Sequence, residues 1–391
     1  MKKMNKQELI EYFISLLGDN SILGSVISIN EIREKLESLI EGVTYDEEKS
    51  ERAANNCFNG ITGKSIINFD LDKIHVELEN EVIVHELLHV LSEGTTSYER
   101  EDGKTIYEMR MGLQRSTGII GDNYIEYNRA INEGMTDYLA ERITGVKNPG
   151  YQVEKNTYKL LRAIIREEDL LRIYLRSAPN TNINIALKKA AIARYGKDIG
   201  EEIGDDIIKI LALSDNMLNI DIQMMTTEKD ETKLDLYKKM FEETQKTFMN
   251  IFNKVIDNEP DIVKKLRIMK QCMSTSLRKP VAENALNALI DSNKYTINEK
   301  IVFFRVTKDL DNTLIQNETI ERLLLESYDS DRMTADEKLK VYVQMHQGEW
   351  TWEEHDRIYN RCYGISEPKE TMQDDGKMDK KGDTVGEDDG R

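Results

Sequence analysis

An apolar stretch of this chain contains the pattern His-Glu-x-x-His, at His85, Glu86 and His89. An α-helix places residues i and i+4 on one face, so two imidazoles at this spacing can bind one metal ion. The glutamate beside them can act on a metal-bound water. The rest of residues 82–91 is Val, Ile and Leu, which predicts a helix that is buried nearly all round. A buried helix whose polar groups are these three side chains is typical of a metal site.

A pair of histidines in a hydrophobic core is the alternative interpretation of this pattern. The chain has only 5 histidines in 391 residues. Its residue frequencies give on the order of 0.01 accidental matches, so chance explains the pattern poorly.

A second helical pattern, at residues 130–141, contains a further carboxylate that suits a metal. Apolar residues recur there at spacings of three and four, and Glu133 precedes the apolar face. Catalytic zinc commonly takes two histidines and one glutamate and keeps its fourth position for water, which predicts Glu133 as third ligand. Asp137, one turn later, is predicted to accept a hydrogen bond from the outer nitrogen of a ligating histidine. The alternative for Glu133 is a solvated carboxylate that favours the helix dipole, with Asp137 or Glu141 as third ligand instead.

The combination of His-Glu-x-x-His with a later Asn-Glu-x-x-x-Asp resembles the gluzincin zinc metallopeptidases, of which the thermolysin group is the best known. The resemblance covers residues 82–142, about a sixth of the chain. It implies one zinc ion per chain, held by His85, His89 and Glu133, with Glu86 as general base.

The same resemblance implies roles for two neighbouring residues. Asp137 matches the carboxylate that orients the first histidine of the pair, and Asn132 matches an active-site asparagine of the family.

Two departures from the family pattern concern the substrate pocket. The 43 residues between His89 and Glu133 exceed the family's spacing, so residues 92–129 are predicted to form an inserted loop or hairpin over the site. Asp102 and Gly103 there form a good hairpin turn.

The second departure is that the family's oxyanion-stabilising histidine has no match soon after the third ligand. A phenol can donate a hydrogen bond to a developing oxyanion, so nearby tyrosines are candidates. Tyr127 is the first choice, with Tyr107 and Tyr124 as the others.

Composition bears on partners and compartment. A net charge of −18 argues against nucleic acid as a partner, because phosphate binding relies on basic surface. No run approaches the roughly 20 apolar residues of a membrane span, so no membrane partner is predicted. The N-terminus lacks the apolar core of a signal peptide, and the three cysteines are few and far apart. These features favour a cytoplasmic protein with reduced thiols.

Four regions are predicted along the chain. They are N-terminal helices at 1–50, the zinc catalytic region at 51–150, a helical domain at 151–365 and a disordered acidic tail at 366–391.

Several elements within these regions are specific enough to check. The first helix should end near Gly18, and the second should run from Ser28 to Gly42. Residues 64–70 favour a strand flanking the site. Apolar residues at helical spacing over 234–255 favour a helix with an internal core face, or alternatively a coiled-coil surface for a partner. Trp350 and Trp352 are interpreted as packed aromatics rather than a substrate platform.

The fold class predicted from these patterns is α+β and mainly α. It has a small catalytic unit, with a short sheet and the His-Glu-x-x-His helix, and a large helical C-terminal portion. The predicted function is a zinc-dependent metallopeptidase that hydrolyses a peptide or protein substrate through a metal-activated water. The alternatives are a catalytically silent interaction scaffold on the same fold and zinc-dependent hydrolysis of a non-peptide amide. Cleavage specificity and oligomeric state are left open by the sequence.

Overall fold

The computed structural model divides the chain into two units, Met1–Gln316 and Asn317–Arg391. The described residues are 3–18, 22–45, 54–59, 63–99, 104–119, 124–226 and 230–258, with a few positions between 334 and 363. The elements below belong to the first unit. In these residues the chain is mainly helical with a small sheet part, which agrees with the predicted α+β class.

The N-terminal helices begin with side-chain caps. Helix α1 (Lys6–Leu17) has a capping box in which Asn5 and Glu8 each accept the other's backbone N–H, and it is capped by Gly18 as predicted. After the short helix η1 (Ile22–Ser25), helix α2 (Ile29–Leu39) begins at Ser28, whose hydroxyl accepts a backbone N–H of the first turn.

The predicted end of this second helix at Gly42 is wrong. Ile40 is extended (φ −79°, ψ 121°) and begins strand β1 (Ile40–Thr44). The strand pairs with a neighbour that lies more than twenty residues later, and this tertiary pairing overrides the helical pattern.

The first sheet has the order β1-β3-β2. Its central strand β3 (Lys64–Phe69) confirms the strand predicted over 64–70. Strand β3 pairs parallel with β1 and antiparallel with β2 (Ala54–Asn59). Strand β2 therefore lies on an edge of this sheet.

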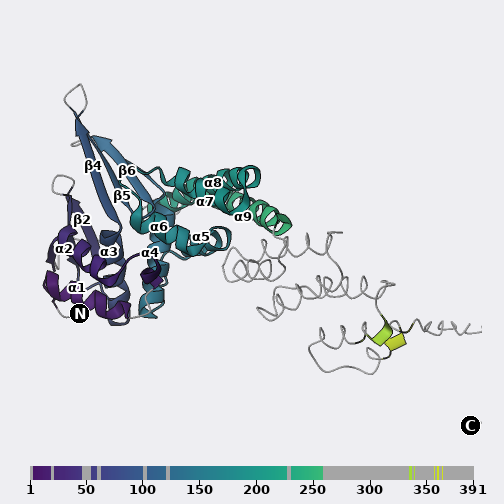
Figure 1. Ribbon diagram of the computed structural model, residues 1–391, viewed down its shortest axis with the longest axis horizontal. Coiled ribbons are helices and arrows are strands. Elements are labelled where there is room, and N and C mark those ends of the chain that lie inside the picture. The colour runs from purple at the N-terminus through teal and green to yellow at the C-terminus, as the bar shows by residue number, and fades with distance from the viewer. Residues whose placement is uncertain are drawn as a thin grey trace, which may run out of the picture. The chain divides into compact units, whose positions relative to one another are not determined.

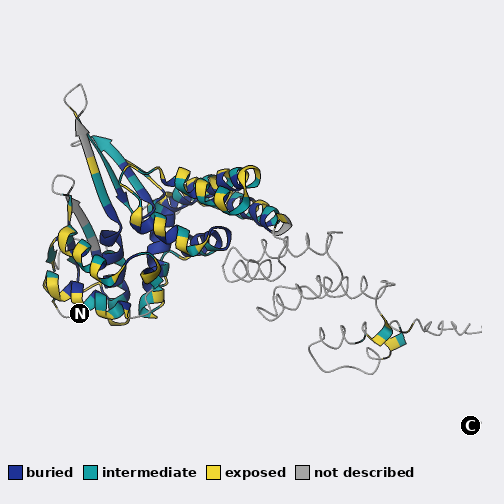
Figure 2. Cartoon of the chain, viewed as in Figure 1, coloured by how far each residue is buried: buried dark blue, intermediate teal, exposed yellow. Residues whose placement is uncertain are grey.

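Two helices carry the motif residues and pack on each other. Helix α3 (Glu79–Leu91), which follows the short helix η2 (Val76–Leu78), is buried nearly all round as its apolar run predicted. Helix α4 (Arg129–Thr144) is also largely buried. Figure 2 shows the buried residues concentrated where these helices meet the base of the second sheet.

The second sheet is an antiparallel meander that fills most of the chain between the two helices. Its strands are β4 (Glu93–Glu99), β5 (Thr105–Met111), β6 (Gln114–Ile119) and β7 (Tyr124–Tyr127). They pair in sequence order, which confirms the hairpin predicted within 92–129. In Figure 1, β4, β5 and β6 run side by side away from the helices.

Helices follow from residue 152 to residue 258. They are α5 (Gln152–Ile164), α6 (Glu167–Arg176), α7 (Ile183–Tyr195), α8 (Lys197–Thr226) and α9 (Glu231–Asn258). The core face predicted over 234–255 is confirmed for the second half of α9, where Phe248, Ile251 and Val255 are buried, whereas Leu234 is 42% exposed. Trp350, Trp352 and residues 366–391 lie outside the described residues.

None of the helices in the described part of the chain has the length and apolar character that crossing a bilayer requires.

Candidate metal centre

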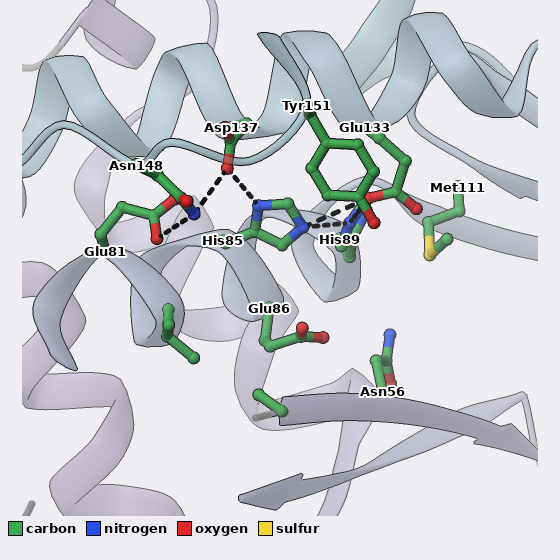
Figure 3. Close-up of a pocket in the computed structure, with 12 residues that line it drawn as sticks. Asn56, Glu81, His85, Glu86, His89, Met111, Glu133, Asp137, Asn148 and Tyr151 are labelled. Carbon is green, nitrogen blue, oxygen red and sulfur yellow. Dashed lines mark hydrogen bonds and ion pairs between the residues drawn. The ribbon is translucent and has the colours of Figure 1, made fainter. Parts of the chain in front are cut away.

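Three side chains from α3 and α4 converge on one point (Figure 3). The Nε2 atoms of His85 and His89 lie 3.0 Å apart. The Glu133 Oε2 atom lies 3.4 Å from the His85 Nε2 and 3.5 Å from the His89 Nε2. The two histidines are one turn apart on α3, and Glu133 comes from the second turn of α4, which packs on α3. The structure thus brings together the residues that the sequence predicted as ligands.

The size of this triangle suits a tetrahedral zinc ion. Zinc binds histidine nitrogen and carboxylate oxygen at about 2.0–2.2 Å, so neighbouring ligand atoms of a tetrahedron lie about 3.3–3.5 Å apart. The separations of 3.0, 3.4 and 3.5 Å are close to that spacing. The group of His85, His89 and Glu133 can therefore hold a metal ion.

Polar side chains face the outer nitrogens of both histidines. The Nδ1 of His85 lies 3.4 Å from Oδ1 of Asp137, a fully buried carboxylate. The Nδ1 of His89 lies 3.4 Å from the side-chain amide of Asn132, whose oxygen accepts the backbone N–H of Leu113 at 2.9 Å. Asn132 thereby ties the β5–β6 turn to α4. Asp137 and Asn132 thus lie at the outer nitrogens of the two rings, and Asp137 also lines the neighbouring cavity.

The charges of the triangle are strongly coupled. Burial acts to lower the pKa of His85, but hydrogen bonds to Asp137 and Glu133 outweigh it and raise this pKa well above its ordinary value. Burial acts to raise the pKa of Glu133, but the two imidazoles outweigh it and hold this pKa well below its usual range. These opposite shifts favour an ion pair between His85 and Glu133, whose Nε2 and Oε2 atoms lie 3.4 Å apart.

A second group of possible ligands, Glu81, His85 and Asp137, shares one histidine with the first. The Nζ atom of Lys155 lies 2.8 Å from Asp137 Oδ2, and this ammonium opposes a second cation. Burial, with the nearby Asp137 carboxylate, raises the pKa of Glu81 to about 8, which favours a protonated carboxyl that is a poor ligand. The triangle that includes His89 is therefore the better metal site.

A cavity of about 350 Å³ opens beside the triangle. Its lining residues come from β2, α3, β5, α4 and the loop that follows α4: Ala54, Asn56, Glu81, Val82, His85, Glu86, His89, Met111, Glu133, Asp137, Asn148 and Tyr151. In Figure 3 the Glu86 side chain extends from α3 into the space between the histidines and Asn56 of strand β2. A carboxylate in this position can exchange protons with a water or substrate held at the triangle.

The structure does not bring Tyr127 to this cavity, so the first choice for the oxyanion-stabilising residue is corrected. Tyr127 pairs with Arg115 in the sheet and is 45% exposed. Met111, which does line the cavity, pairs with Gln114, the neighbour of Arg115. Successive side chains on a strand point to opposite faces, so Tyr127 lies on the face of the sheet that is turned away from the cavity. Tyr107 is not a lining residue, and the side chain of Tyr124 lies outside the described part of the chain.

The tyrosine that does line the cavity is Tyr151, which the sequence did not single out. Its ring stacks on the His85 ring with centroids 6.3 Å apart and planes 13° apart. In the view of Figure 3 the hydroxyl end of this ring points toward the side of His85 on which Glu133 lies. Its backbone is left-handed (φ 48°, ψ 36°), a strained conformation for an aromatic residue that often marks a functional site. The sequence signal for this turn was the preceding Asn-Pro-Gly, at residues 148–150.

The opposite wall of the cavity is fixed by a buried carboxylate. Glu93 accepts hydrogen bonds from the Asn56 amide at 2.5 Å and from the Ser65 hydroxyl at 2.6 Å. Burial raises the pKa of Glu93 to about 7 despite these donors. Glu93 thus joins the second sheet to the first and holds Asn56 in place on the cavity wall.

Comparisons with protein-family models, with curated proteins and with solved structures found no match to this chain. The interpretation of the site therefore rests on its own geometry and chemistry.

Proposed function

We propose that this protein is a zinc-dependent metallopeptidase of the gluzincin type that hydrolyses a peptide or protein substrate. The observation that carries the proposal is the convergence of two imidazole nitrogens and one carboxylate oxygen beside a cavity that also contains Glu86. Structural zinc sites are closed by four protein ligands, whereas catalytic sites use three and leave a position for water. Among the described residues, three ligands meet here, which favours catalysis.

Each of the surrounding side chains has a part in the proposed hydrolysis. A zinc ion would supply a bound water of lowered pKa and would polarise the scissile carbonyl. Glu86 takes a proton from that water and later donates it to the leaving amine. Asp137 holds the proton of His85 on Nδ1, so that the lone pair of Nε2 is directed toward the other two ligands.

Tyr151 takes the oxyanion-stabilising role in this proposal. Its ring stacks on His85 and lines the same cavity, and in Figure 3 its hydroxyl end points toward the ligand triangle, where the substrate carbonyl would bind. Tyr151→Phe removes one hydrogen-bond donor while keeping the ring stacked on His85. We expect the variant to keep its zinc and to lose about 10²–10³-fold in kcat.

The decisive experiment compares Glu86→Gln with the wild type in two measurements. Elemental analysis gives the zinc content, and a peptide-library assay gives the turnover. We expect about one zinc per chain in both proteins and turnover in the wild type only. The matched control is Glu79→Gln, the same change on the same helix at a residue that does not line the cavity. Turnover retained by Glu86→Gln would remove Glu86 from the role of general base.

The identity of the third ligand is tested by the metal content of Glu133→Ala. Its loss of zinc would support the triangle, whereas normal zinc retention would place the third ligand elsewhere. A metal-free wild type that cannot be reloaded would favour the interaction scaffold. A zinc-loaded wild type that cleaves no peptide but hydrolyses other amides would favour the non-peptide alternative.

A further inference from the structure

A buried lysine lies behind the candidate metal centre. Lys155, on helix α5, is 1% exposed, and its ammonium contacts three oxygens. These are Asp137 Oδ2 at 2.8 Å, Glu141 Oε1 at 2.7 Å and the Asn148 carbonyl oxygen at 2.5 Å. The contacts with Glu141 and Asn148 are hydrogen bonds, and the contact with Asp137 is an ion pair.

Such a group is poorly explained by stability alone. Lysine is almost never fully buried, and replacing a buried ion pair with apolar residues is often neutral or stabilising. A buried lysine that is held by three oxygens therefore points to a positional role.

The contacts of Asp137 indicate what that role is. Its two oxygens face different partners, since Oδ1 faces the Nδ1 of His85 at 3.4 Å and Oδ2 faces the ammonium of Lys155. The ion pair with Lys155 thereby favours the orientation of the carboxylate in which Oδ1 is directed at the ring. Among the described residues, Lys155 is the lysine or arginine that forms an ion pair with Asp137.

The loop between α4 and α5 is held by the same ammonium. The Asn148 carbonyl accepts from Lys155, and the Asn148 amide lies 2.8 Å from Glu81 Oε2 and 3.2 Å from Asp137 Oδ1. The Asn148 backbone N–H donates to Glu141 at 2.9 Å. The loop is thus fixed three residues before Tyr151, which stacks on His85.

We propose that Lys155 is a positioning residue of the metal centre, which acts through Asp137 on His85. The inference rests on the proposed function, because His85, the histidine that Lys155 orients through Asp137, is taken there as a zinc ligand. Lys155 touches neither the triangle nor the cavity, so its effect on zinc is transmitted through the Asp137 carboxylate. Outer partners of ligating histidines typically change metal affinity 10–100-fold when they are removed.

A double-mutant cycle on zinc affinity tests this route. Zinc dissociation constants are measured by competition with a chromophoric chelator for the wild type, Lys155→Met, Asp137→Asn and the double variant. We expect each single variant to bind zinc about 10–100-fold more weakly, and the double variant to bind no more weakly than Asp137→Asn. If Lys155 merely stabilised the fold, the double variant would lose zinc affinity by the sum of the two single-variant losses in binding free energy. Such additive losses would overturn the proposal.

Two further variants distinguish a positioning role of Lys155 from a contribution to packing alone. Glu141→Gln removes the other carboxylate partner of Lys155 but leaves the ion pair with Asp137, and it should bind zinc within about threefold of the wild type. Lys155→Met combined with Glu141→Gln keeps the net charge of the cluster unchanged. This double variant takes the place of Lys155→Met if that variant alone does not fold. It should weaken zinc binding as much as we expect for Lys155→Met.

A crystal structure of the metal-free Lys155→Met variant gives a readout that does not depend on zinc. We expect the Asp137 carboxylate to turn away from the Nδ1 of His85. An unchanged carboxylate would overturn the proposal even if zinc affinity fell. A wild type that binds no zinc would instead contradict the proposed function, and the crystal structure would still decide the role of Lys155.

Discussion

Gly134 provides a test of how closely α4 and α5 pack, because local propensity and tertiary packing predict opposite signs for one substitution. In an ordinary helix interior, Gly→Ala stabilises by about 1 kcal/mol. At Gly134 an added Cβ would lie 2.3 Å from the carbonyl carbon and 2.4 Å from the carbonyl oxygen of Glu154. Carbon atoms in contact prefer about 3.5–4.0 Å, so α5 would have to move by roughly 1 Å.

The size of the expected effect follows from the atoms that are contacted. Overpacking a core costs about 1–3 kcal/mol, and the cost belongs at the upper end here because backbone atoms cannot rotate away. After the gain in helix propensity, we expect Gly134→Ala to lower the free energy of unfolding by about 2 kcal/mol. The melting temperature should fall by about 4–8 °C.

Urea denaturation of the metal-free protein measures this change without involving the proposed zinc. The control is Gly24→Ala, where an added Cβ would meet nothing within 4 Å, and it should change stability by no more than about 0.5 kcal/mol. A Gly134→Ala variant as stable as the wild type, with an unchanged m-value, would refute the close packing of α4 on α5. It would also weaken the proposal that Lys155 positions Asp137, because Lys155 directly follows Glu154 on α5.

Three further predictions concern the charges around α3 and α4. Burial acts to lower the pKa of His85, but its carboxylate partners raise it well above the ordinary 6.5, so we expect this ring to be protonated at neutral pH in the metal-free protein. Zinc loading should therefore release about one proton, measured by calorimetry in buffers of different ionisation enthalpy, and zinc affinity should rise with pH. Because the pKa of His85 is raised in the folded state, the stability that its protonated ring contributes to the metal-free protein is fully present below about pH 6.5. This stability is lost as pH rises through the folded-state pKa, and urea midpoints measured from about pH 6.5 upward would show the loss. Asp215 of α8 accepts hydrogen bonds from the backbone N–H groups of Asn128 and Ala130 at 2.6 and 2.8 Å. Asp215→Ala should therefore lower the free energy of unfolding by about 1–2 kcal/mol. An unchanged urea midpoint would contradict this capping role.

The two candidate histidine ligands could be predicted because their geometry is local. His85 and His89 lie on one helix face by spacing alone, and Glu86 follows from the same pattern. Glu133 and Asp137 lie one turn apart on α4, so a single packing of α4 on α3 brings both to the first histidine.

The remainder of the site depends on long-range packing that no local pattern encodes. Tyr151 reaches His85 because its left-handed backbone ends a loop that is held by Asn148. The wrong choice of Tyr127 has a related cause, since closeness in sequence to Glu133 says nothing about the face of a strand. The predicted helix end at Gly42 failed because strand pairing begins at Ile40.

Helix α4 shows why the helices after residue 151 matter to a site whose candidate ligands all precede them. The side chain of its N-cap residue, Asn128, makes no capping hydrogen bond, and Asp215 of α8 accepts the first N–H groups in its place. One turn beyond Glu133, Lys155 of α5 holds the carboxylate that faces His85. Both ends of the segment that carries Glu133 are therefore fixed by later helices. A ligand triangle with edges of 3.0–3.5 Å requires that precision, because a shift of α4 by 1 Å would separate Glu133 from the two histidines.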